Sequence, residues 1–121
     1  MNEGVNLNKV PYVYWSDVTK VSHLQRRIIV YSIMYYQLNE SCISDAKYEA
    51  ISKQLVNMQK VMDPEDLKKT AYYYVMHDFN GSTGFDLYHK LNTKDKKQLN
   101  SIARAVLRQW EKENENEQGN Q

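Results

Sequence analysis

The chain has 121 residues, enough for one domain with a single hydrophobic core. Its 16 Lys and Arg residues nearly balance its 15 Asp and Glu residues, so the formal net charge is +1 and a nucleic-acid partner is disfavoured. The single cysteine, Cys42, excludes an internal disulfide and favours a reducing, cytoplasmic location. We expect no membrane partner and no secretory leader, because no apolar run approaches the roughly 20 residues that span a bilayer.

Residues 1–15 are predicted to form an extended N-terminal arm, because they carry Pro11, scattered asparagines and the alternating stretch YVYW. Ser16 is then a suitable N-cap for a helix, since apolar residues recur behind it at steps of three and four. These residues are Val18, Val21, Leu24, Ile28, Tyr35 and Leu38. The pattern predicts one long helix over about 17–39, at the start of a single helical domain spanning 16–111.

The segment NESC interrupts this pattern, and Ser44 can cap a second helix behind it. The apolar stripe of this second helix consists of Tyr48, Ile51, Leu55, Met58 and Met62. Because only a short turn separates the two helices, we expect them to form an N-terminal helical hairpin.

The remaining elements are also predicted to be helical. Proline fits the first position of a helix, so Asp63-Pro64 predicts a third helix that runs to about His77. The loop NGSTG at 80–84 is interpreted as a connecting turn, followed by a short helical turn over 85–91.

Thr93 can cap a last helix with a clean apolar face. The face consists of Leu99, Ile102, Ala103, Val106, Leu107 and Trp110. Residues 112–121 are rich in Glu, Asn and Gln and are predicted to form a disordered tail. The fold expected is therefore an all-α bundle of four to five helices.

One group of residues suggests a binding site at the turn of the hairpin. Tyr35 and Tyr36 lie near the end of the first predicted helix, and Asp45, Tyr48 and Glu49 share one face in the first turns of the second. The hairpin brings these two ends together. Two aromatic rings beside two carboxylates could hold a flat, cationic ring such as nicotinamide.

The segment YYQLNESCISDAKYEAISKQL resembles the N-terminal helical subdomain of bacterial NAD-dependent DNA ligases, which captures the nicotinamide mononucleotide (NMN) half of NAD. The positions that match the family pattern are Tyr35, Ile43, Asp45, Ala46 and Tyr48. Tyr36 stands where the family has histidine, Glu49 where it has aspartate, and the turn lacks the family's proline. The resemblance covers about residues 26–57. It implies a ligase-like hairpin that binds NAD or NMN through Tyr35, Tyr36, Asp45, Tyr48 and Glu49.

The same residues have a purely structural interpretation. Asp45 and Glu49 favour the positive end of a helix dipole, and Tyr35 and Tyr48 can simply pack the hairpin. Ligation by this chain is excluded, because none of its four glycines follows the Lys-x-Asp of the ligase nucleotidyltransferase motif. We therefore expect no enzymatic activity, no required cofactor and no metal site.

The run Tyr72-Tyr73-Tyr74 must point at least one ring away from the core, since consecutive helical residues fan out by about 100°. We expect Tyr72 or Tyr73 to contact a protein partner. The resemblance to an isolated fragment of a ligase, together with the richness in Asn, Lys and Tyr, suggests a phage or prophage product. The chain resembles phage anti-defence proteins that inhibit sirtuin-type NADases of the host. Inhibition of a host defence protein is thus one predicted function, and an NAD- or NMN-binding accessory module is the alternative.

Overall fold

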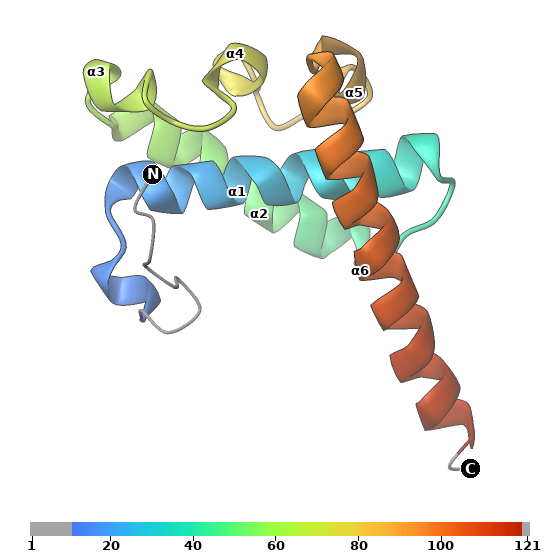
Figure 1. The fold of residues 1–121 in the computed structure, drawn as a ribbon. Helices are drawn as coiled ribbons and strands as arrows, with labels where there is room; N and C mark the ends of the chain where they lie inside the picture. Colours follow the sequence, from blue (N-terminus) through green and yellow to red (C-terminus); the bar gives the residue numbers. More distant parts are fainter. Residues whose placement is uncertain (1–10, 120–121) are drawn as a thin grey trace.

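The computed structural model describes the backbone of residues 11–119 and the side chains of residues 11–113. Within the described backbone the chain is all-α, as predicted, and no strand is present. Its α-helices are α1 (Asp17–Ser32), α2 (Asp45–Val61), α3 (Pro64–Leu67), α4 (Tyr73–Met76), α5 (Leu87–Lys90) and α6 (Thr93–Gly119). In Figure 1, α1 and α2 lie side by side, the short helices α3 to α5 follow one edge, and α6 crosses α1 steeply and projects beyond the body. No helix in this part of the chain is long and apolar enough to cross a membrane.

The predicted helical hairpin is formed by α1 and α2. Ser16 caps α1 by accepting a hydrogen bond from the Thr19 amide at 3.2 Å, and Ser44 caps α2 through the Lys47 amide at 3.1 Å. The first predicted helix, 17–39, is not a uniform α-helix, however. Its last turn, η3 (Ile33–Gln37), is π-helical, and its wider pattern is completed by the bond from the Leu38 amide to the Ile33 carbonyl at 3.0 Å.

The hydrophobic core lies where α1, α2 and α6 meet and is closed by the short helices. Its buried apolar side chains are Val21, Leu24, Ile28, Ile29, Val30, Ile33, Met34, Ile51, Leu55, Tyr72, Val75, Met76, Leu87, Leu91, Leu99, Ala103 and Leu107. The spacing of three and four in this list is the helical spacing of the sequence, so each long helix buries one stripe. This packing fixes the hairpin, and with it the turn between α1 and α2.

A buried amide network ties the hairpin to the chain that follows it. The Gln25 side-chain nitrogen donates to Gln59 Oε1 at 2.9 Å and to Thr70 Oγ1 at 3.0 Å. Gln25 Oε1 accepts from the Tyr72 amide at 3.0 Å, and Gln59 Nε2 donates to the Met76 carbonyl at 3.0 Å. Every buried polar group needs a partner, and here each amide group finds one. The network therefore fixes how residues 70–76 lie across α1 and α2.

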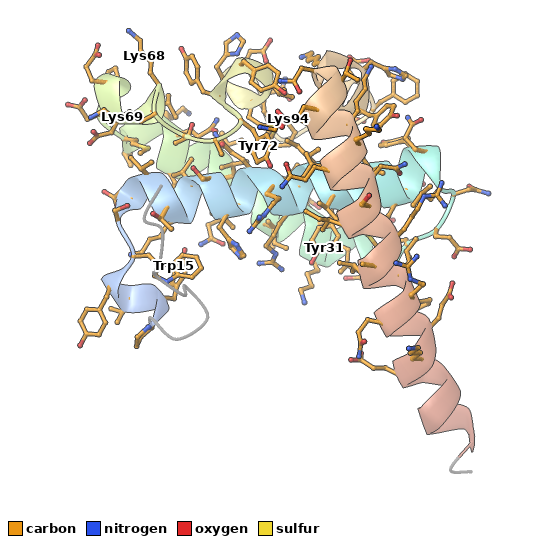
Figure 2. All side chains as sticks on the ribbon, in the orientation of Figure 1. Trp15, Tyr31, Lys68, Lys69, Tyr72 and Lys94 are labelled. Atoms are coloured by element: carbon orange, nitrogen blue, oxygen red, sulfur yellow. The ribbon has the colours of Figure 1, made fainter. Side chains whose placement is uncertain are left out.

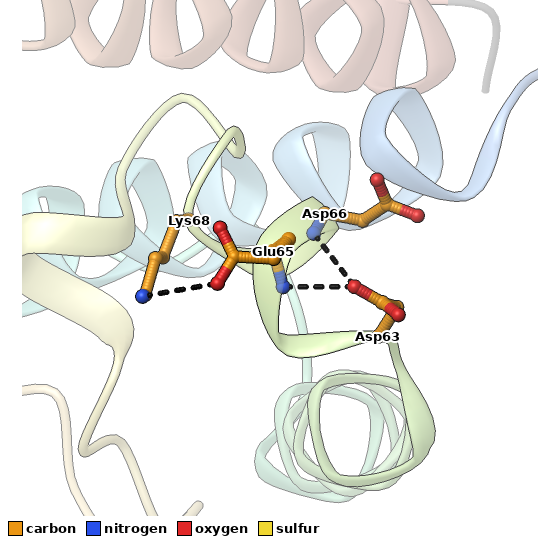
Figure 3. A network of polar contacts seen from close by, with 4 residues as sticks. All are labelled: Asp63, Glu65, Asp66 and Lys68. Carbon is orange, nitrogen blue, oxygen red and sulfur yellow. Dashed lines mark hydrogen bonds and ion pairs between the residues drawn. The ribbon is translucent and has the colours of Figure 1, made fainter.

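The prediction of a continuous third helix to His77 is wrong. Asp63 starts α3 as expected, since its carboxylate accepts from the Glu65 and Asp66 amides at 2.9 Å and 3.4 Å (Figure 3). The helix ends at Leu67: the Lys69 and Thr70 amides bond to carbonyls only three residues back, and the next two amides are bonded to side chains of α1 instead of to the preceding turn. The Ala71 amide, for example, donates to Ser22 Oγ at 2.9 Å. The chain becomes helical again only in α4.

The start of the described chain also differs from its prediction. Residues 1–10 of the predicted arm lie outside the described residues. An extended conformation is wrong for Tyr12–Tyr14, which form a single 3-10 turn, η2, closed by the bond from the Trp15 amide to the Tyr12 carbonyl at 3.0 Å. The Trp15 ring packs edge-on against His23, with ring centroids 5.3 Å apart, and this contact holds the turn on α1 (Figure 2).

The predicted disordered tail is likewise wrong for residues 112–119, which continue α6 as far as Gly119; residues 120–121 lie outside the described residues. Glu, Lys and Gln are good helix formers, and pairs four apart add support, as Gln109 and Glu113 do at 3.2 Å. The side chain that caps α6 is Asn92, whose Oδ1 accepts from the Asp95 amide at 2.8 Å, and not the predicted Thr93.

Candidate functional site

A pocket of about 420 Å³ opens at the turn of the hairpin. Its walls are the end of α1 with η3, the turn at 41–44, the start of α2 and the loop at 81–83. All five residues predicted to bind a ligand line it, namely Tyr35, Tyr36, Asp45, Tyr48 and Glu49. Pockets for small organic ligands have volumes of roughly 300–1,000 Å³. The structure therefore gathers the predicted residues around a space of suitable size.

The aromatic wall of the pocket is built by the π-helical turn. Tyr35 and Tyr36 pack edge to face, with centroids 4.8 Å apart and planes at 79°. Tyr36 is held further by the Phe85 ring, 5.4 Å away at 89°, and by a 2.9 Å hydrogen bond between its hydroxyl and that of Thr83. Tyr35 remains 55% exposed. Its ring is consequently the one that can stack on a ligand.

Ser32 and Tyr48 connect the two helices on the inner side of the pocket. The Ser32 hydroxyl donates its proton to the Ile28 carbonyl at 2.8 Å, so at 3.1 Å from the Tyr48 oxygen it must accept the phenol proton. Burial raises the pKa of Tyr48, and the bond to Ser32 only partly opposes this. Tyr48 is therefore a neutral phenol at physiological pH, and its oxygen keeps lone pairs that can accept a hydrogen bond from a ligand.

The two carboxylates lie at the mouth of the pocket, on the first turns of α2. Asp45 is exposed and begins α2, where the positive end of the helix dipole stabilises a negative charge. Glu49 forms an ion pair with Lys53 at 3.1 Å, in which both side chains are more than half exposed. Exposed pairs of this kind are weak, so Glu49 can turn toward a ligand at little cost.

The loop at 81–83 is the part of the pocket that the sequence did not predict, because this glycine loop was interpreted only as a connecting turn. Gly81 has a φ of +85°, which a residue with a side chain adopts at a cost. Cys42 was also not predicted to line the pocket, and burial raises the pKa of its thiol. The thiol therefore stays protonated at neutral pH, as expected for a group that does not act as a nucleophile.

The expectation that Tyr72 is exposed for a partner is wrong, whereas a partner contact at Tyr73 stays a prediction. Tyr72 is only 8% exposed and packs beside α1, to which its backbone amide is bonded through Gln25 (Figure 2). The break after α3 rotates the tyrosine run, so that Tyr74 is the exposed ring, at 42%. Tyr73 is half-buried and packs against His77, with centroids 5.4 Å apart. The tyrosine run and the pocket are separate features.

The N-terminal turn does not fill the pocket. Trp15 packs against His23 and Tyr12 lies under Lys20, both in the first half of α1, and no residue from Tyr12 to Trp15 lines the pocket. Among the described residues, no group of three or more His, Cys, Asp or Glu side chains is placed to hold a metal ion. No family model, no curated protein and no solved structure matches the chain. Any assignment of function therefore rests on the pocket itself.

Proposed function

We propose that the chain is a binding module for the nicotinamide ring of a nucleoside or nucleotide such as NAD or NMN. The observation that supports it is that all five residues selected from the sequence line one open pocket of about 420 Å³. A role in packing the hairpin would bury the Tyr35 ring, whereas that ring is 55% exposed. The pocket thus supports the ligand-binding function that the ligase resemblance implies.

The chemistry of the walls suits a nicotinamide cation. The positively charged ring can stack on the Tyr35 face, and cation–π contacts contribute about 0.5–2 kcal/mol. The carboxylates of Asp45 and Glu49 balance the ring charge from the other wall. The Tyr48 oxygen can accept a hydrogen bond from the carboxamide. A cytoplasmic location, expected from the single cysteine, would give the chain access to such ligands.

Calorimetric titration of the purified chain with nicotinamide riboside, NMN and NAD tests this function. We expect at least one of the three to bind with a micromolar dissociation constant. Tyr35→Ala should weaken that binding by roughly 3- to 30-fold through the lost ring contact. Tyr14→Ala is the matched control, because Tyr14 is 77% exposed and does not line the pocket. Absence of binding by all three ligands to the folded chain would refute the proposal.

Inhibition of a host defence protein of the sirtuin-type NADase class stays a prediction. One observation favours a protein partner: Tyr35, Tyr36 and Phe85 form an exposed aromatic cluster at the pocket rim, and aromatic side chains are enriched in interfaces. NADase assays with and without the chain test it. A Phe85→Ser variant that loses inhibition would support this function, whereas an NADase that is neither bound nor inhibited would contradict it.

A further inference from the structure

All the formal charges in the lining of the pocket are negative. Its lining contains two carboxylates, Asp45 and Glu49, and among the described residues that line it there is no Lys or Arg. The rest of the lining is made of aromatic, hydroxyl and apolar groups. A ligand that carries a phosphate would therefore enter a site where the only formal charges are negative.

No cation of the described chain belongs to the lining, and three lie outside it: Lys53, Arg27 and Lys47, whose charge reaches the lining residue Cys42. Lys53 is paired with Glu49 at 3.1 Å and neutralises that carboxylate in part. The Arg27 guanidinium donates to the Tyr31 hydroxyl at 3.3 Å and lies over the same ring, 5.7 Å from its centroid. Asp45, in contrast, takes part in no ion pair within the described chain. The mouth therefore carries one carboxylate, that of Asp45, without an ion-pair partner, and the Lys47 ammonium lies on the same turn of α2 outside the lining.

The start of α2 does not compensate for the missing cation. A helix N-terminus offers free amides and a positive dipole end to a phosphate. Here the Lys47 amide is already bonded to Ser44 Oγ, and the Asp45 carboxylate lies in the first turn, where it repels a second anion. The described lining therefore offers a phosphate group hydrogen-bond donors but no cationic partner.

We infer that the pocket selects a nicotinamide ligand that is positively charged and carries no phosphate, which is the nucleoside in preference to NMN or NAD. This inference rests on the proposed function and names the ligand class within it. Attraction between the pyridinium ring and the carboxylates favours every nicotinamide ligand of this type. Repulsion between the carboxylates and the phosphate weakens only the binding of the nucleotides. NMN and NAD should therefore bind less tightly than the nucleoside.

The test is a calorimetric titration with nicotinamide riboside and NMN at low and high salt. At about 50 mM salt the riboside should bind roughly tenfold more tightly, and the ratio should shrink at about 500 mM because salt screens exposed charges. Equal or tighter binding of NMN would overturn the inference and leave the proposed function standing. No binding by either ligand, nor by NAD, would overturn the proposed function itself.

Charge variants test which side chains cause the preference for the riboside over NMN. Asp45→Asn and Glu49→Gln should each lower the riboside-to-NMN ratio, by weakening the riboside and strengthening NMN, whereas Lys53→Gln should raise it. Glu65→Gln, in the exposed α3 pair with Lys68, is the matched control and should leave the ratio unchanged (Figure 3). Circular dichroism checks that each variant is folded. An unchanged ratio in both carboxylate variants would refute selection by these charges.

Discussion

Gly84 lies directly against Ser32. A Cβ at Gly84 would overlap the Ser32 hydroxyl and come within 2.6 Å of the Tyr48 hydroxyl oxygen. Only glycine allows this approach, because it brings the loop backbone onto the pair of side chains that joins α1 to α2. The contact fixes the loop at 81–83 as a wall of the pocket.

Gly84→Ala should therefore push the loop away from α1. We expect the free energy of unfolding to fall by about 1–3 kcal/mol, the usual cost of overpacking, and ligand binding to weaken with it. Urea denaturation and calorimetry measure the two effects. Ser101→Ala, at an exposed position of α6, is the control and should change stability by less than about 0.5 kcal/mol. Wild-type stability in Gly84→Ala would contradict the described packing.

Replacement of Gln25 tests the buried amide network. Gln25→Met keeps most of the side-chain volume but removes the partner of the Tyr72 amide, of Gln59 Oε1 and of Thr70 Oγ1. Leaving a buried polar group unpaired costs about 1–3 kcal/mol, so a loss of at least roughly 2 kcal/mol is expected in urea denaturation. Gln54→Met, exposed on α2, is the matched control. A loss below that of the control would show that the network contributes little.

Two buried serines on neighbouring helices should respond in opposite ways to alanine. The Ser32 hydroxyl bonds to Ile28 and Tyr48, so Ser32→Ala should lower the free energy of unfolding by about 1–2 kcal/mol. The Ser52 hydroxyl is fully buried and makes no hydrogen bond of good geometry in the described structure, although it lies close enough to Tyr48 to oppose weakly the rise in that phenol's pKa. Ser52→Ala should therefore leave stability unchanged or raise it by up to about 1 kcal/mol. Equal losses in the two variants would contradict this assignment.

The free energy of unfolding should fall at alkaline pH because the pKa of Tyr74 is raised in the folded chain. Partial burial and the 2.5 Å hydrogen bond donated to Asp95 raise the pKa of Tyr74 to about 12. An unfolded tyrosine has a pKa near 10, so the stabilising contribution is complete below about pH 10 and is lost as the pH rises through 12. The pKa values of Tyr48 and Tyr72 are raised as well, which adds to the same fall.

The measurement is urea denaturation between about pH 9 and pH 11. Tyr74→Phe should be less stable than the wild type at the lower pH and should lose less stability as the pH rises. Tyr14→Phe removes an exposed phenol and is the matched control. Identical slopes in Tyr74→Phe and the wild type would contradict the role given to the bond with Asp95.

The hairpin and its capping residues could be predicted from the sequence because they depend on local information. Helical spacing gave α1 and α2, and the caps Ser16 and Ser44 are side chains that bond three residues ahead. Folding the helices back across a short turn was then enough to gather Tyr35, Asp45 and the other predicted lining residues. Whether these residues bind a ligand stays a prediction.

The remaining parts could not be predicted because they depend on contacts between distant residues. The loop became a pocket wall through Gly84, whose neighbours Ser32 and Tyr48 are 52 and 36 positions away in the sequence. The third helix has acceptable helical spacing, yet it breaks because the Tyr72 amide is bonded to Gln25 on α1. The break also changes the direction in which the three tyrosines 72–74 point. Helical periodicity alone therefore could not predict that Tyr74 is the exposed ring.

The π-helical turn has a consequence for the rotational register of the hairpin. A π turn amounts to one extra residue inserted into an α-helix, and each residue of an α-helix turns the chain by about 100°. Deleting Tyr35 or Tyr36 would remove this extra residue, so the turn could close as a regular α-helix while the residues on either side keep their positions. The pocket would then lose one of its two rings, although the hairpin still folds. The number of residues in this turn therefore determines the aromatic wall of the pocket as much as their identity does.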